Sequence, residues 1–354
     1  MQLMLAAVLT LDSAVARLGV YADDDGLAVW SPQATASGDI AGGVGAEAGY
    51  AADVITAATV DVRTAASPRG YQETRHEVHA GPHWELRPGT AVRATYSWST
   101  ERDYRSHVVS AGGAHDLLGR RLTLSVLARF LADEVGRAGE ASFAKPLRGY
   151  GGDVGAAVVV DRRTVAGVTY AVQRLDGFQA SPYRFVPIRD GAGEVRASLP
   201  EAVPDGRLRH AMSVDARRAL SSRFFARGAY RVYADSWGVR SHTAEGELAR
   251  SLGGDRATVA LRARGYTQGP ADFHEARYAT WPMLPRWRDA DKKLGRNRSV
   301  LGGVRADFGV GAIGPLREVR AEASLDVYDQ WFLDFPALRR RRAALVGLGW
   351  SAQW

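Results

Sequence analysis

Ala344-Leu345-Val346-Gly347-Leu348-Gly349-Trp350-Ser351-Ala352-Gln353-Trp354 is the segment that decides the fold of this chain. Apolar residues occupy every even position, and most odd positions are small or polar. Because successive residues of a β-strand point to opposite faces, this strand has one apolar face with two tryptophans and one small, wet face. Outer-membrane barrels have this pattern, with lipid outside and water inside. An ordinary half-buried edge strand is the competing interpretation.

The same alternation recurs along the chain, which favours the barrel. It is clear in Val44–Val54, Val92–Ser99, Leu122–Phe130, Ala257–Arg264 and Val319–Val327. Charges occur at the wet positions too often for a soluble β-sandwich, whose inner face is apolar. We expect one all-β domain, a transmembrane antiparallel barrel whose lipid-facing side chains include Tyr50, Trp98, Phe130, Tyr170, Leu261, Val327 and Trp350.

Strand number follows from counting the alternating segments. Fifteen segments start from Leu27, and residues 15–22 supply a short additional strand. Because the first and last strands of a closed antiparallel barrel must pair, the number must be even. We predict sixteen strands, with fourteen or eighteen as the near alternatives.

Connections between these segments are of two kinds that alternate strictly. Short turns rich in Gly, Pro, Asp and Ser lie at 38–41, 87–90, 118–120, 161–163, 220–222, 253–255 and 311–315. Mostly long, irregular loops lie near 55–72, 133–148, 175–205, 269–297 and 330–341. This sidedness predicts short periplasmic turns and long outer loops.

Composition restricts the function classes. The chain of 354 residues has a net charge of +7, contributed almost wholly by arginine, since the lysines are only Lys145, Lys292 and Lys293. The arginines recur beside acidic residues instead of forming a basic stripe, which argues against nucleic acid as a partner. No stretch approaches the ~20 apolar residues of a membrane helix. There is no cysteine, so thiolate and disulfide chemistry are excluded.

The first residues predict export. Met1 to Leu11 form a short apolar core, and Ala14-Val15-Ala16 forms an Ala-x-Ala cleavage site. We therefore expect residues 1–16 to be a partial or truncated signal peptide and residues 17–354 to be the barrel domain. The strand expected at 15–22 overlaps this cleavage site, which is a conflict. A signal peptide that starts further upstream would resolve it.

Several stretches together resemble a known family. They are Tyr21–Asp25, Thr74–Val78, Leu175–Ile188, Arg207–Ala211 and the run from Tyr230 to Thr243, in which Asp-Ser-Trp-Gly-Val-Arg-Ser-His-Thr is the most specific part. The chain is similar, over roughly residues 17–354, to an uncharacterised domain-of-unknown-function family of bacterial outer-membrane barrels. The resemblance implies a fold and a location in the outer membrane of a Gram-negative bacterium. It implies no substrate and no catalytic residue.

Charged residues at the wet positions are the candidate functional site. An arginine-rich lumen favours anions, so we expect a porin-like channel or transport conduit for small anionic or polar solutes. A non-conducting structural barrel, held by Arg–carboxylate pairs and anchoring a periplasmic or surface partner, is the alternative. The predicted lumen-lining residues are Arg75, Arg93, Arg129, Arg207, Arg209, Arg227, Arg231, Arg262, Arg264, Arg305, Glu77, Asp235, Glu245 and Glu247.

Other chemistry is weaker in the sequence. An acyl hydrolase embedded in the barrel ranks behind both alternatives, because Ser241 and His242 are adjacent on one strand and therefore point to opposite faces. Asp23, Asp24 and Asp25 resemble ligands for a hard cation, and His79 with His83 share one strand face. A polar turn at Asp23–Asp25 and solvated lumen histidines are the favoured interpretations, so we predict no metal site and no cofactor.

Expected partners follow from the membrane location. They are the lipid bilayer, lipopolysaccharide phosphates near Arg339–Arg342, a periplasmic or lipoprotein partner and the barrel-assembly machinery, which would read the terminal Trp354. The loops at 175–205 and 269–297 are rich in aromatic residues and proline. We expect them to be ordered, to constrict or cap the pore, and to carry ligand specificity.

Overall fold

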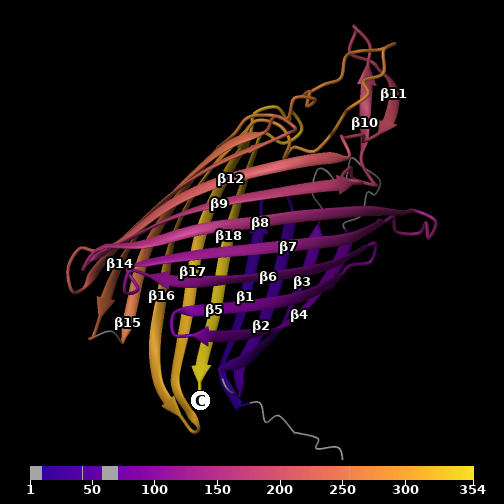
Figure 1. The fold of residues 1–354 in the computed structure, drawn as a ribbon. Coiled ribbons are helices and arrows are strands. Elements are labelled where there is room, and N and C mark those ends of the chain that lie inside the picture. Colours follow the sequence, from indigo (N-terminus) through magenta and orange to yellow (C-terminus); the bar gives the residue numbers. More distant parts are fainter. Residues whose placement is uncertain (1–9, 42, 58–70, 255) are drawn as a thin grey trace, which may run out of the picture.

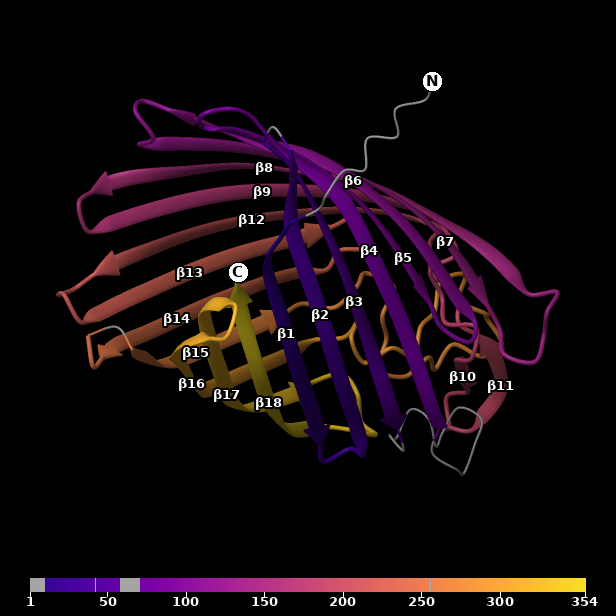
Figure 2. The same cartoon turned by 90° about the horizontal axis from the view of Figure 1, so that it is seen from below.

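Sixteen strands close into one antiparallel barrel in the computed structural model (Figures 1 and 2). The structure describes residues 10–41, 43–57, 71–254 and 256–354. The order around the ring is β1-β18-β17-β16-β15-β14-β13-β12-β9-β8-β7-β6-β5-β4-β3-β2, and β10 with β11 form a separate two-stranded sheet. Among the described residues no helix is long and apolar enough to cross a membrane. The predicted all-β barrel of sixteen strands is confirmed.

Most barrel strands have 11 to 18 residues, long enough for the ~9–11 residues that a tilted strand needs to cross a bilayer. The strands are β1 (Thr10–Asp23), β2 (Leu27–Ala41), β3 (Val44–Ala57), β4 (Tyr71–Arg87), β5 (Thr90–Thr100), β6 (Tyr104–Leu117), β7 (Leu122–Gly136), β8 (Ala144–Asp161), β9 (Thr164–Gly177), β10 (Phe185–Arg189), β11 (Val195–Pro200), β12 (Gly206–Ala219), β13 (Phe224–Asp235), β14 (Arg240–Leu252), β15 (Ala257–Gln268), β16 (Asn297–Ile313), β17 (Leu316–Phe332) and β18 (Arg340–Gln353).

The first and last strands form the closing seam. β1 and β18 pair from Ser13↔Gln353 to Asp23↔Ala343. The strand expected at 15–22 is thus present but begins earlier, at Thr10. Ala16, the expected end of the signal peptide, pairs with both Trp350 and Ala34, so that boundary lies inside a barrel strand and stays a prediction.

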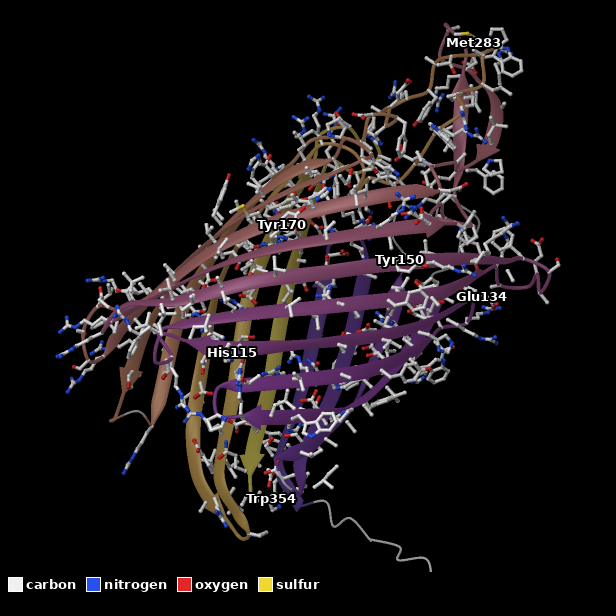
Figure 3. The ribbon with its side chains drawn as sticks, in the orientation of Figure 1. His115, Glu134, Tyr150, Tyr170, Met283 and Trp354 are labelled. Carbon is white, nitrogen blue, oxygen red and sulfur yellow. The ribbon has the colours of Figure 1, made fainter. Side chains whose placement is uncertain are left out.

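Alternation along the strands separates an apolar outer wall from a polar interior. Leu261, Val327 and Trp350 are 62%, 62% and 64% exposed on the outer wall. Tyr50, Phe130 and Tyr170 are exposed there too, and Trp98 is half-buried. Figure 3 shows Tyr150 and Tyr170 on this wall. The face predicted for these side chains is the observed one.

The two ends of the barrel differ, and we call them the turn end and the loop end. The turn end joins β2–β3, β4–β5, β6–β7, β8–β9, β12–β13, β14–β15 and β16–β17 at the predicted short turns. The loop end carries the other connections. The expected loop at 133–148 is shorter than predicted, because β7 and β8 stay paired up to Gly136↔Ala144. The expected loop at 55–72 lies mostly outside the described residues.

Two loops build an ordered subdomain above the loop end. The predicted loop at 175–205 contains the hairpin of β10 and β11, which sequence reasoning missed. Ile188 of that hairpin bridges to Tyr278 of the β15–β16 loop, and Ala202 bridges to Arg288. Val186, Ile188 and Tyr278 form a small buried core. Met283 of the β15–β16 loop lies beside β10 and β11, opposite to Trp354 (Figure 3). Both loops therefore have defined mutual contacts, while the expectation that they constrict or cap the pore and carry partner or ligand specificity stays a prediction.

Candidate functional site: the arginine-lined interior

Every predicted lumen residue lies on the strand face opposite to the exposed apolar wall. On β15, Leu261 is exposed outside while its neighbour Arg262 faces the interior. On β13, Tyr230 is exposed outside while Arg227 and Arg231 occupy the alternate positions. This arrangement follows directly from the two-residue period of a strand. The barrel therefore gathers the charged residues on one concave surface.

Ion pairs within and between strands hold many of these side chains. The guanidinium of Arg264 lies 3.4 Å from Glu245 and that of Arg305 lies 3.5 Å from Glu247. Arg75 lies 2.7 Å from Glu77 and 3.9 Å from Glu101. Arg129 also pairs with Asp153, and Arg320 with Asp307. Such pairs orient the interior side chains and partly neutralise their charge.

One pair spans a whole strand. Arg262 of β15 pairs with both carboxylate oxygens of Asp326 on β17, although β16 lies between them. Gly303 occupies the intervening position in register with both residues, and a Cβ at Gly303 would collide with the Asp326 carboxylate. The absence of a side chain at Gly303 therefore makes room for the pair.

Arg207 and Asp235 form the most buried pair of the predicted set. The Arg207 Nε donates to Asp235 at 2.9 Å, and the Asp235 carboxylate also accepts the Tyr233 hydroxyl. Its other oxygen accepts the backbone N–H groups of Trp237 and Val239, closing the β13–β14 turn. Asp235 is thus a structural anchor of the loop end, a role that its predicted place in the lumen did not indicate.

Other interior arginines are exposed to solvent. Arg93, Arg227 and Arg231 are exposed, and within the described residues none of them forms an ion pair. A hollow of about 310 Å³ on the inner face is lined by four arginines and three carboxylates: Arg227, Arg262, Arg264, Arg305, Glu245, Glu247 and Asp326. Positive charge therefore exceeds negative charge around this hollow. Arg209 differs, because it is half-buried, with its Nε enclosed, and its guanidinium donates to Gln173.

The predicted metal candidates have protein partners. Asp23 accepts the backbone N–H of Leu27 and lies 3.6 Å from Arg341, while Asp24 accepts the backbone N–H of Arg342. Asp25 pairs with Lys292 at 3.4 Å. These contacts are those of a polar turn tied to neighbouring segments.

His79 and His83 face the interior and lie against glycines of β3. His79 lies over Gly49 and His83 over Gly45, where any added Cβ would collide with the imidazole rings. His79 is also 3.9 Å from Glu47. Within the described part of the chain, neither histidine belongs to a group of three ligand atoms lying close together.

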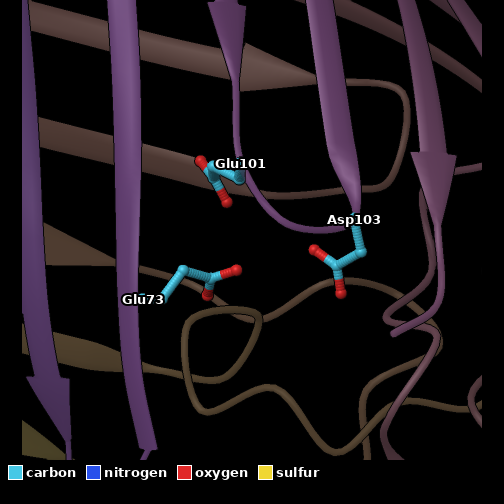
Figure 4. A group of neighbouring side chains, drawn as sticks. All are labelled: Glu73, Glu101 and Asp103. Carbon is cyan, nitrogen blue, oxygen red and sulfur yellow. The ribbon is translucent and has the colours of Figure 1, made fainter. Parts of the chain in front are cut away.

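Among the described residues, Glu73, Glu101 and Asp103 are the one such group, with ligand atoms within 4.8 Å of one another (Figure 4). Burial raises the pKa of the Glu101 carboxyl above its ordinary value, although the charge of Arg75 acts in the opposite direction. Asp103 also accepts the Tyr183 hydroxyl from the β9–β12 loop. Sequence reasoning missed this group because β4 and the β5–β6 connection bring it together only in the folded barrel.

Ser241 and His242, weighed for hydrolase chemistry, point to opposite faces as expected. Ser241 is buried on the inner face, whereas His242 is on the outer wall, bound to Tyr230. At the turn end, the backbone N–H of Trp354 donates to the carbonyl of Asp12 on β1. Recognition of Trp354 by assembly machinery stays a prediction.

A comparison with family models decides the family. Residues 148–333, more than half of the chain, match the family described as "Protein of unknown function (DUF3570)". The chain belongs to the DUF3570 family. A comparison with functionally curated proteins gives no match.

Solved structures with a similar fold are outer-membrane barrels. A "Bacterial polysaccharide outer membrane secretin" aligns with a TM-score of 0.55 and 9% identity, over 96% of this DUF3570 chain and 98% of the other. OprD of Pseudomonas aeruginosa aligns with a TM-score of 0.48 and 10% identity, over 97% and 94% of the two chains. The siderophore receptor PirA of Pseudomonas aeruginosa has a TM-score of 0.46 and 13% identity, over 90% and 56%. The first of these likenesses supports the outer-membrane barrel fold and nothing finer.

Proposed function

We propose that this DUF3570 protein is a passive channel in the outer membrane of a Gram-negative bacterium, with a preference for small anionic or polar solutes. The observation that carries the proposal is the solvent exposure of Arg93, Arg227 and Arg231 inside the ring. An interior packed with side chains would bury them. Sixteen-stranded barrels are wide enough to leave an aqueous path.

The charge of the interior supports the anion preference. Arginines that form no ion pair keep more of their field, and a wall of low dielectric constant concentrates that field in the lumen. Paired residues such as Arg262 with Asp326 contribute less, because their charges largely cancel at short range. The arginines without ion pairs are therefore the residues to test.

Planar-bilayer recording of the purified barrel is the direct test. We expect stepwise conductance and, in a salt gradient, a reversal potential on the anion-selective side. The double change Arg227→Gln and Arg231→Gln should move the reversal potential towards that of the cation. The matched control Arg105→Gln, which changes an exposed arginine on the outer wall, should leave it unchanged.

A silent bilayer at every voltage would favour the alternative, a non-conducting barrel that anchors a partner. The interior ion pairs support that alternative. If the double variant conducts with an unchanged reversal potential, the protein is a channel but these two arginines do not line its path. Heat-modifiable migration in a gel must be confirmed for each variant first, so that misfolding is not mistaken for silence.

A further inference from the structure

The outer wall carries a groove near the loop end, between β13 and β17. Its volume is about 510 Å³, and its lining includes Tyr230, His242, Ala244, Gly265, Arg298, Val300 and Trp331. Tyr230, Ala244, Gly265 and Val300 lie side by side in one row of paired residues. Small residues at the two middle positions leave the depression between bulkier neighbours.

Arginines flank an aromatic ring at one side of this groove. Trp331 of β17 pairs with Arg298 of β16 on one side and with Arg340 of β18 on the other. The Cζ atoms of both arginines lie 5.3 Å from the centroid of the Trp331 ring. Cation–π contact holds both guanidinium groups beside the Trp331 ring, where their N–H groups can meet a bound anion.

The net charge beside the groove is positive. Arg342 lies one step deeper on β18, in register with Asp329. Asp329 forms its ion pair with Arg340, whereas Arg298 and Arg342 form no ion pair within the described residues. Three guanidinium groups, of Arg298, Arg340 and Arg342, therefore lie near two carboxylates, of Asp329 and Asp24, on a wall that is otherwise mostly apolar.

The apolar wall begins immediately below. Leu248, Leu261, Val304, Leu325 and Val346 form a paired row of exposed residues, four positions nearer the turn end on each strand. Four residues correspond to about 13 Å along a strand. Because the strands are tilted by ~45°, the distance between this row and the groove measured across the membrane is smaller than that. The groove therefore lies at the edge of the apolar band, where lipid headgroups are found.

A repeated pair of stacked side chains occurs at four places around the barrel. Tyrosine and histidine stack on the outer wall of four hairpins that are joined at the loop end, with hydroxyl-to-Nδ1 distances of 2.7 to 2.8 Å: Tyr50 with His76, Tyr96 with His107, Tyr170 with His210 and Tyr230 with His242. Tyrosine is enriched where a membrane meets water. Because the tyrosine hydroxyl contacts the histidine Nδ1, the histidine Nε2 can make a second polar contact. The pair Tyr230–His242 lines the groove.

We propose that this groove binds the phosphorylated headgroup of a membrane lipid. Arg298 and Arg342 supply charge-assisted hydrogen bonds to phosphate, Arg340 and Trp331 fix their side of the site, and His242 contacts the headgroup from the opposite side. Acyl chains then lie on the apolar row below. The site is independent of whether the barrel conducts.

Native mass spectrometry of the detergent-purified barrel tests the proposal. The probes are diphosphorylated lipid A, the same glycolipid without its phosphates, and inorganic phosphate. We expect the unmodified protein to retain lipid A and to lose it roughly tenfold more readily after Arg298→Gln with Arg342→Gln. The control Arg105→Gln, at an exposed outer-wall arginine near the loop end but outside the groove, should retain lipid A normally.

Three outcomes overturn the proposal. They are equal retention of the glycolipid that lacks phosphates, undiminished retention by the double variant, and displacement of lipid A by inorganic phosphate at equal concentration. The first comparison uses only the unmodified protein, so it decides the matter even if the double variant fails to fold. Arg298→Lys keeps the charge but loses the bidentate geometry, so its retention of lipid A should lie between that of the unmodified protein and that of the double variant.

Discussion

The Asp289 carboxylate organises the loop subdomain through several contacts. Its side chain is fully buried, and its two oxygens lie 3.1 and 3.0 Å from the His274 Nδ1. The Tyr278 hydroxyl donates to the Phe273 carbonyl and accepts the backbone N–H of Asp289. Because a buried charge needs partners to be tolerated, these contacts hold the two halves of the β15–β16 loop together and position Tyr278, which bridges to Ile188 of β10.

At this site we predict a pH dependence of loop stability. Burial lowers the pKa of His274, but the hydrogen bond and charge of Asp289, with Asp334 and Asp291 further off, outweigh it and raise the pKa. The stabilisation is therefore complete below the unfolded value of about 6.5 and is lost as pH rises through the raised folded value. Limited proteolysis within residues 275–287 should become faster over that rise.

The variant Asp289→Asn should abolish this dependence and destabilise the docked loop by about 2 kcal/mol, roughly thirtyfold in the opened population. Glu140→Gln is the matched control, because Glu140 is an exposed, ion-paired carboxylate of another loop. Cleavage that is independent of pH in the unmodified protein would contradict the role given to His274.

Among the elements, the β13–β14 connection is one of the short ones at the loop end, with residues 236–239 between the two strands. Asp235 caps it, and the guanidinium of Arg207 lies 4.1 Å from the centroid of the Trp237 ring. Gly238 has a φ of 87°, in the left-handed region that other residues adopt at a cost. Its Cα also faces the Asp272 carboxylate, so that a Cβ would collide there.

We therefore expect Gly238→Ala to destabilise this turn by about 1–2 kcal/mol from backbone strain alone, with the collision adding to it. A lower midpoint temperature for loss of the heat-modifiable band would report the change. Gly246→Ala is the control, because a Cβ at Gly246 of β14 meets open space. Equal midpoints for the two variants would show that the turn tolerates a side chain.

Strands and their faces were predictable because alternation is a local property of the sequence. The fold class, the strand number and the turn positions all follow from it. Contacts between distant residues were not predictable in this way. The pair of Arg262 with Asp326 depends on Gly303 in an intervening strand, and Glu73 meets Asp103 only after β4 and the β5–β6 connection are placed. The β10–β11 hairpin was missed because each of its strands has only five or six residues.

On the scale of the whole molecule, the loop subdomain is tied to the barrel rim and its two loops are also tied to each other. Lys292 pairs with Asp25 of the β1–β2 turn, and the Tyr183 hydroxyl donates to Asp103 of the β5–β6 connection. Within the subdomain, Arg184 lies 3.0 Å from Asp291. Glu201 accepts the backbone N–H groups of Ser181 and Ala290, and burial raises its pKa. The barrel strands do not depend on these contacts, since their own ladder of backbone hydrogen bonds is complete around the ring.

Because the barrel strands do not depend on the subdomain contacts, we predict that the subdomain can be loosened without opening the barrel. Ile188 is fully buried against Tyr278, so Ile188→Ala should weaken docking by ~2–5 kcal/mol. Proteolysis between residues 185 and 200 should accelerate, while the heat-modifiable band stays. Val195→Ala, at an exposed position of the same hairpin, is the control. Loss of the folded band in Ile188→Ala would instead mean that the barrel requires the subdomain.

The seam between β1 and β18 has a consequence for synthesis. The first strand finds one of its two neighbours only when the last strand has been made, so the ring cannot close while the chain is still growing. Until then both edges expose unpaired backbone groups along their full length, which is the geometry that promotes sheet-to-sheet aggregation. Long-range pairing of this kind is slow. The growing chain must therefore be kept apart from its copies until its final residues are available.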